Sequence, residues 1–213
     1  MNLADYVLPF VTLIISLTVH EAAHALFALW GGDRTAYLAG QVTLNPLPHI
    51  QREPIGMLAL PLVTLLSSHG QYCFGFAHAP YDPYWALRHP RRAALMSLAG
   101  PLGNLLLASI AFGVLTAIAR PAPGSEESIR TIAKSFLLLN LFLALFNLVP
   151  LPPLDGAGIV RGLVPPAGRL FDAIASIPYA TLVIIVLLSN WISTLFWPVY
   201  LVVDRWLPYS TLY

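Results

Sequence analysis

Long runs of apolar residues alternate along the chain with short segments rich in glycine, proline and charge. Three runs, at about residues 6–30, 93–119 and 132–149, are long enough to cross a bilayer as α-helices. A helix rises about 1.5 Å per residue, and the hydrocarbon core is about 30 Å thick. A fourth run, at about residues 178–203, is predicted as an extra C-terminal span, and the tryptophans in and near it are typical anchors at a membrane interface. The pattern predicts an all-α membrane protein.

Two shorter segments interrupt this pattern. The apolar run 55–66 contains Pro61 and is short for a span, so it is consistent with a tilted crossing or with a re-entrant or interfacial segment. Residues 37–44 have an extended pattern, with Gly40 where a hairpin could turn, and they predict a small β-hairpin. We therefore expect about 4–5 transmembrane helices, one short re-entrant or interfacial segment and one hairpin.

Composition supports a membrane location, since 57% of the residues are hydrophobic and only 10% are charged. Soluble domains carry roughly 25% charged residues, so this chain lacks the charge to cover a surface in contact with water. The net charge of +1 offers no basic surface for nucleic acid. We predict a single integral-membrane domain over residues 1–213, with a catalytic core at about 6–160. No cleavable signal peptide is expected, because Asp5 is the only charge before the first apolar run.

Arginine and lysine residues help to orient the chain. If the segment 55–66 crosses the bilayer, the 11 cationic residues divide 6 to 5 between the two sides, and if it returns they divide 7 to 4. Cationic residues favour the cytoplasmic side, so the second arrangement is preferred and its larger group is cytoplasmic. That group consists of Arg34, Arg52, Arg88, Arg91, Arg92, Arg161 and Arg169.

One short motif in the first span indicates metal chemistry. His20 and His24 lie one turn apart on the same helix face, so both imidazoles can reach one ion. The adjacent Glu21 can reach a water on that ion, and this spacing suits Zn²⁺ with a general base beside it. A structural histidine could explain one of the three residues. Three ionisable groups in one turn of a spanning helix are costly unless they are paired or coordinated.

A catalytic zinc usually has three protein ligands, so a third must come from elsewhere in the chain. Most of the 10 acidic residues lie in loops or at the ends of spans, beside solvent. Asp155 differs because it follows a proline-rich break after the run 132–149. Irregular backbone at membrane depth occurs only where it lines a cavity or is buried in protein. The carboxylate could therefore approach a metal held by another helix, but an N-cap or a loop turn is an equally good interpretation.

The candidate site has two halves, the motif His20-Glu-x-x-His24 and the stretch Asn147-x-x-Pro running into Pro-Leu-Asp155-Gly. Paired in this way, the two halves resemble the site-2 protease family of intramembrane zinc metalloproteases. It extends to the stretches 40–49, 75–80 and 99–104, and so covers about residues 19–158. We expect the compact form of the family, without a PDZ or CBS domain.

The resemblance implies a role for each matching residue. His20 and His24 match the family's zinc-binding histidines. Asp155 matches the third zinc ligand and Glu21 the catalytic glutamate, while Asn147 matches an asparagine that touches substrate or the developing oxyanion. The implied activity is hydrolysis of peptide bonds in or near transmembrane segments of other proteins. One Zn²⁺ per chain is implied as cofactor, and transmembrane protein substrates and the lipid bilayer are implied as partners.

In the implied mechanism Glu21 takes a proton from the attacking water and passes it to the leaving amine. A substrate helix must first unwind, and residues 37–44 could form an edge to which it adds as a strand, although an ordinary capping hairpin is as consistent. His20 and His24 lie near the C-terminal end of the first span, and Asp155 follows the end of another. With a returning segment 55–66, these ends share the arginine-rich side. We therefore expect the active site nearer the cytoplasmic face of the cell membrane.

Two other functions fit parts of the sequence. A membrane di-iron desaturase or hydroxylase also gathers histidines, but it would need several clusters. The remaining histidines are isolated: His49, His69, His78 and His89. A catalytically silent relative could bind membrane substrates or act as a chaperone, although every expected catalytic residue is present. Metal content and the effect of Glu21→Gln on cleavage distinguish these functions.

Overall fold

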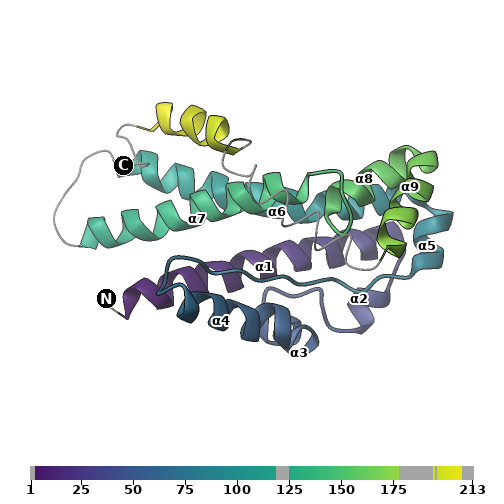
Figure 1. The fold of residues 1–213 in the computed structure, drawn as a ribbon, viewed down its shortest axis with the longest axis horizontal. Coiled ribbons are helices and arrows are strands. Elements are labelled where there is room, and N and C mark those ends of the chain that lie inside the picture. Colours follow the sequence, from purple (N-terminus) through teal and green to yellow (C-terminus); the bar gives the residue numbers. More distant parts are fainter. Residues whose placement is uncertain (1–2, 119–124, 178–193, 195, 208–213) are drawn as a thin grey trace.

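The computed structural model describes residues 3–118, 125–177, 194 and 196–207, and the regular structure in this part of the chain is helical (Figure 1). The elements are α1 (Ala4–Gly31), α2 (Thr35–Leu38), α3 (Pro46–Arg52), η1 (Ile55–Ala59), α4 (Leu60–Ser67), α5 (Pro83–Arg88), α6 (Pro90–Ala117), α7 (Ser125–Asn147), α8 (Asp155–Leu163) and α9 (Pro165–Ser176). Residues 196–205 form a further helical stretch. The predicted all-α class is confirmed for the described residues.

Three of the described helices are long and apolar enough to cross a membrane. They are Tyr6–Gly31 in α1, Pro90–Ala117, which is α6, and Glu127–Asn147 in α7. These helices coincide with the three long apolar runs that predicted spans. Most of the fourth run, residues 178–203, lies outside the described residues. The described part of the chain therefore has three candidate spans, and it does not support the predicted total of 4–5.

Helix α6 lies at the centre of the fold and packs against α1, α7 and α8 (Figure 1). With α7 it forms an apolar cluster that includes Leu115 and Leu137. Large apolar side chains remain exposed on the outer faces of the long helices, among them Val11, Leu102 and Ile110. Soluble proteins rarely leave such faces uncovered, whereas the acyl chains of a bilayer cover them. The chain is therefore a membrane protein whose outer faces suit lipid.

The short apolar run 55–66 does not form a span. It folds into the π-helical turn η1, with 5 residues, which continues directly into α4, with 8 residues. At about 1.5 Å per residue this length reaches about 20 Å, short of the hydrocarbon core of about 30 Å. The chain then reverses at His69 and Gly70, whose φ angles of 53° and 83° are left-handed. Gly70 adopts such a conformation without strain.

After the reversal, residues 71–82 run back as an extended stretch along α1 (Figure 1). The N–H of Phe76 donates to the carbonyl of Gly56 at 3.1 Å, which ties this returning arm to η1. The N–H of Asp82 donates to the carboxylate of Asp33 at 2.8 Å, just beyond the end of α1. The segment leaves from one end of α1 and returns to the same end. Of the two interpretations of the sequence, the re-entrant one is therefore the one that the structure supports.

This return gathers basic residues at the C-terminal end of α1. Helix α5 docks there, and the indole N–H of Trp85 donates to the carbonyl of Gly31 at 3.1 Å. The guanidinium of Arg92 donates to the same carbonyl at 3.0 Å. Helices α8 and α9 lie at this end too (Figure 1), where Gly162 packs against the backbone of Pro90. The arrangement matches the 7-to-4 division of cationic residues rather than the 6-to-5 division.

The β-hairpin predicted at residues 37–44 is wrong. Residues Thr35–Leu38 form helix α2, and the described part of the chain contains no strand. The carboxylate of Asp33 accepts hydrogen bonds from the backbone N–H and the hydroxyl of Thr35, at 2.8 Å and 2.6 Å. Such local side-chain bonds compete with extended pairing and favour a turn here. The strand-edge role suggested for this segment therefore has no structural basis.

Candidate metal centre

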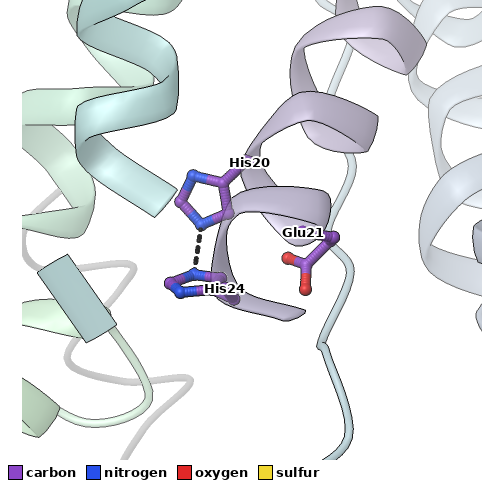
Figure 2. A group of neighbouring side chains, drawn as sticks. All are labelled: His20, Glu21 and His24. Atoms are coloured by element: carbon purple, nitrogen blue, oxygen red, sulfur yellow. Dashed lines mark hydrogen bonds between the residues drawn. The ribbon is translucent and has the colours of Figure 1, made fainter. Parts of the chain in front are cut away.

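The first part of the site is built by α1 alone, as its spacing predicted. His20, Glu21 and His24 occupy one turn in the second half of the helix and are 6%, 3% and 7% exposed. Their possible ligand atoms all lie within 4.8 Å of one another. The Nε2 atoms of the two imidazoles are 3.0 Å apart, and Figure 2 shows these atoms facing each other, with the Glu21 carboxylate to one side.

Helix α6 comes very close to this turn because Gly100 has no side chain. A Cβ atom at Gly100 would lie 2.6 Å from both Cε1 and Nε2 of His20, and closer still to Nε2 of His24. A Cβ atom at Gly103 would meet Ala23 at 3.4 Å. The close approach of the two helices therefore depends on Gly100, which lets the backbone of α6 cover the imidazoles.

Asp155 brings a carboxylate from another part of the fold. It is the first residue of α8 and Leu154 is the N-cap, so the N-cap interpretation of Asp155 is wrong. Its Oδ2 atom lies 3.2 Å from Nε2 of His20, and its Oδ1 atom lies 3.3 Å from Nε2 of His24. Gly156 permits this approach, because a Cβ there would collide with backbone carbonyls of the preceding loop. The structure thus brings the three proposed ligands together.

The outer ring nitrogens of both histidines face oxygen acceptors. Nδ1 of His24 lies 2.7 Å from the carbonyl of Met96, and Nδ1 of His20 lies 2.6 Å from the side-chain oxygen of Asn104. Each Nδ1 therefore carries a hydrogen and donates it, and in the neutral ring this leaves a lone pair on Nε2. Two lone pairs and a carboxylate converge on one buried point. This arrangement suits a cation held between the three groups, because a cation offsets the repulsion between like partial charges that are buried away from water.

The converging groups fit zinc. Zn²⁺ binds imidazole nitrogen and carboxylate oxygen, and a catalytic site takes three protein ligands. Oε2 of Glu21 and Oδ2 of Asp155 are buried, and neither accepts a hydrogen bond within the described residues. Buried oxygens without such a partner are costly. A divalent cation at the centre would offset the charge of both carboxylates.

Asn147 is the one predicted site residue that no contact among the described residues joins to this cluster. It ends α7, and its amide nitrogen donates to the carbonyl of Leu143, one turn earlier in the same helix, at 2.9 Å. Its place near the developing oxyanion therefore remains a prediction.

Sequence reasoning missed Asn104, which appeared only as the last residue of a supporting motif. The side chain is fully buried in the middle of α6 and accepts a hydrogen bond from His20. A usable signal was present in the sequence. An amide in the middle of a spanning helix is costly unless a neighbouring helix supplies hydrogen bonds, so its partner is worth seeking.

Fold and site together define a class of protein, in which long apolar helices carry a buried His-Glu-His cluster that could hold a metal ion. The model of peptidase family M50 matches residues 117–188, which include Asp155. The chain is 39% identical over 166 residues to YwhC of Bacillus subtilis, a match covering 75% of this chain and 70% of YwhC. It is 32% identical over 149 residues to Rip2 of Mycolicibacterium smegmatis, covering 70% of this chain and 54% of Rip2. This chain belongs to peptidase family M50.

Both relatives are named "putative zinc metalloprotease", as is Rip2 of Mycobacterium tuberculosis, which is 33% identical over 144 residues. The resemblance to site-2 proteases seen in the motifs is therefore confirmed. The chain spans about half the length of the Rip2 proteins. No solved structure matches the chain.

Proposed function

We propose that this protein is an intramembrane zinc metalloprotease that hydrolyses peptide bonds in or near membrane-spanning segments of other proteins. The observation that carries the proposal is the convergence of His20, His24 and Asp155 beside Glu21, where both histidines and Glu21 belong to a helix long and apolar enough to cross a membrane. Membership of a peptidase family supports the reaction, and the names of the relatives support zinc.

In this proposal His20 and His24 hold zinc through their Nε2 atoms, and Asp155 holds it through its carboxylate. Zinc bound there supplies Lewis-acid chemistry, because it polarises a carbonyl and makes water acidic near neutral pH. Oε2 of Glu21 makes no hydrogen bond within the described residues, so it is available to a water molecule. It accepts a proton from the attacking water and later returns the proton to the leaving amine.

The re-entrant segment offers a way to hold an unwound substrate. In the extended stretch 71–82, the N–H of Phe76 faces η1. Successive N–H groups of an extended strand point to opposite sides. The N–H groups of Cys73, Gly75 and Ala77 make no hydrogen bond within the described residues. We propose that this edge, rather than the segment suggested by the sequence, pairs with substrate as an added strand.

Metal content tests the proposed site directly. Purified protein should contain about one zinc per chain. His20→Ala, His24→Ala and Asp155→Ala should each lose that zinc, because each removes one of three ligands. The loss of affinity should exceed the roughly 10–100-fold loss that follows removal of an outer partner. Elemental analysis after dialysis against a weak chelator measures this.

His78→Ala is the matched control. This imidazole is exposed, and its Nδ1 atom lies 3.9 Å from a carboxylate oxygen of Glu53. The variant should keep its zinc, because His78 takes no part in the centre. Zinc retained in all three ligand variants, or two irons in the wild type, would contradict the proposed site.

We further propose that the site lies nearer the cytoplasmic face of the cell membrane. His20 and His24 lie in the half of α1 that leads to the basic end, where Trp85 and Arg92 bind the carbonyl of Gly31. The side of a membrane protein that is rich in arginine and lysine is usually cytoplasmic.

Cysteine labelling tests this orientation. The side chains of Leu3 and Tyr84 are 79% and 75% exposed and lie at opposite ends of α1. In a Cys73→Ser background, a membrane-impermeant maleimide should label Leu3→Cys in intact cells. It should label Tyr84→Cys only after the inner face is opened. The reverse pattern would place the site nearer the outer face.

A further inference from the structure

On the Nδ1 side of His20, three buried polar side chains connect the three spanning helices. Asn104 of α6, Asn140 of α7 and Ser16 of α1 are each 0% exposed. None of them belongs to the proposed ligand set. Polar groups between spanning helices are costly unless they are hydrogen-bonded. Their hydrogen bonds form a chain that runs from His20 through Asn104 and Asn140 to the backbone of α7.

The orientation of the Asn140 amide follows from its neighbours at the end of the chain farthest from His20. The carbonyl of Phe136 can only accept, and it lies 2.9 Å from Nδ2 of Asn140. The same Nδ2 atom lies 2.9 Å from the hydroxyl oxygen of Ser16, whose own hydrogen goes to the carbonyl of Thr12 at 2.7 Å. Reversing the Asn140 amide would set its oxygen against a carbonyl. Its Oδ1 atom must therefore face Asn104.

The orientation of Asn140 in turn determines the orientation of the Asn104 amide, which contacts His20. Its Nδ2 atom donates to Oδ1 of Asn140 at 2.8 Å and to the carbonyl of Ser16 at 3.3 Å. With both donor positions used, its Oδ1 atom faces the imidazole and lies 2.6 Å from Nδ1 of His20. An amide oxygen only accepts, so Nδ1 must carry a hydrogen, and in the neutral ring Nε2 then keeps its lone pair.

We propose that Asn104 and Asn140 are positioning residues that hold His20 in one tautomer, with the hydrogen on Nδ1 and with Nε2 free to bind the metal. The inference rests on the proposed zinc site and deepens it. We call the hydrogen bonds from Asn140 through Asn104 to His20 the relay. His24 needs no relay, because its Nδ1 donates directly to the backbone carbonyl of Met96. The acceptor of His20 is a side-chain amide, which can rotate by half a turn unless its neighbours fix it.

Zinc affinity of two Asn140 variants tests the relay. Asn140→Leu removes the shorter of the two hydrogen bonds that fix the Asn104 amide and leaves only the bond to the carbonyl of Ser16 at 3.3 Å. The amide should then be held less firmly, and zinc affinity should fall by about 10-fold. Asn140→Asp in its protonated form keeps an oxygen toward Asn104 and a hydroxyl toward Phe136, so its affinity should stay within about threefold of the wild type. A merely structural role predicts the opposite order, because leucine suits a bilayer better than aspartic acid does.

A variant at Asn104 extends this test. Asn104→Leu removes the direct acceptor of His20 and should weaken zinc binding by about 10–100-fold. Combining it with Asn140→Leu should cause no further loss, because Asn140 acts through Asn104. Ser109→Ala is the control, since this exposed hydroxyl on α6 donates only to the carbonyl of Leu105, and its zinc affinity should not change. The relay would be overturned if the losses of zinc affinity added up in the double variant, or if Asn104→Leu bound zinc as tightly as the wild type.

A second measurement does not depend on zinc. In metal-free protein labelled with ¹⁵N in its histidine rings, the nitrogen chemical shifts of His20 report which ring atom carries the hydrogen. The wild type should show hydrogen on Nδ1, and Asn140→Leu should show a mixture of both tautomers. Hydrogen on Nε2 in the wild type would overturn the inference. A wild type that keeps the Nδ1 tautomer but binds no zinc would contradict only the proposed function.

Discussion

Replacing Glu21 with glutamine is expected to abolish peptide-bond hydrolysis while leaving the zinc in place. The amide keeps the shape of the side chain but cannot accept a proton, and general-base catalysis contributes about 10²–10⁴-fold to rate. Glu21 is separate from the three proposed ligands, so zinc content should remain at about one per chain. Cleavage of a membrane-spanning reporter in detergent or proteoliposomes, together with elemental analysis, measures both effects.

Glu127→Gln is the matched control, because Glu127 is an exposed glutamate on the spanning helix α7. The same chemical change there should leave cleavage and zinc unchanged. If the Glu21→Gln variant cleaved the reporter at the wild-type rate, Glu21 would not be the general base. Zinc binding without any cleavage by the wild type would instead favour the catalytically silent relative. Loss of zinc from the Glu21→Gln variant would show that the Glu21 carboxylate is a metal ligand rather than a general base.

Gly100→Ala should remove zinc binding although it adds only one methyl group. The new Cβ atom would lie 2.6 Å from two ring atoms of His20 and closer to His24, so the imidazoles or the two helices must move apart. A shift of about 1 Å at a reacting centre costs about 100-fold in rate. Zinc content and reporter cleavage should therefore both fall, as measured on protein that remains folded in detergent.

Gly113→Ala separates this effect from helix propensity. Gly113 lies in the same helix, and a Cβ there would meet nothing within 4 Å. Alanine is more favourable than glycine in a helix by roughly 0.5–1 kcal/mol, so this variant should unfold at the same temperature as the wild type or higher, with its zinc intact. Full zinc occupancy in Gly100→Ala would contradict the close packing of α6 on the site.

The sequence interpretation was wrong about which part of the chain is extended. The extended pattern of residues 37–44 describes side-chain polarity but not the local hydrogen bonds of Asp33 and Thr35, which favour a helical turn. The extended stretch of this fold lies instead at residues 71–82. Its conformation depends on contacts with η1 and α1 that the sequence alone does not display, such as the bond from Phe76 to Gly56.

The sequence by itself determined the features that depend on one helix at a time. Span length and apolar character predicted the three long helices, and the spacing of four residues placed His20 and His24 on one face beside Glu21. The motif of His20 and His24, paired with the motifs that lead to Asp155, was sufficient to identify the family.

Only the tertiary structure decided which groups from other elements reach that face. It brought Asp155 to both imidazoles, placed Asn104 on Nδ1 of His20 across 84 positions of sequence, and turned the segment 55–66 back toward its own side. Such contacts depend on how closely α1, α6 and α8 approach, which is set at positions such as Gly100 by the absence of a side chain. A local pattern carries no information about such distances.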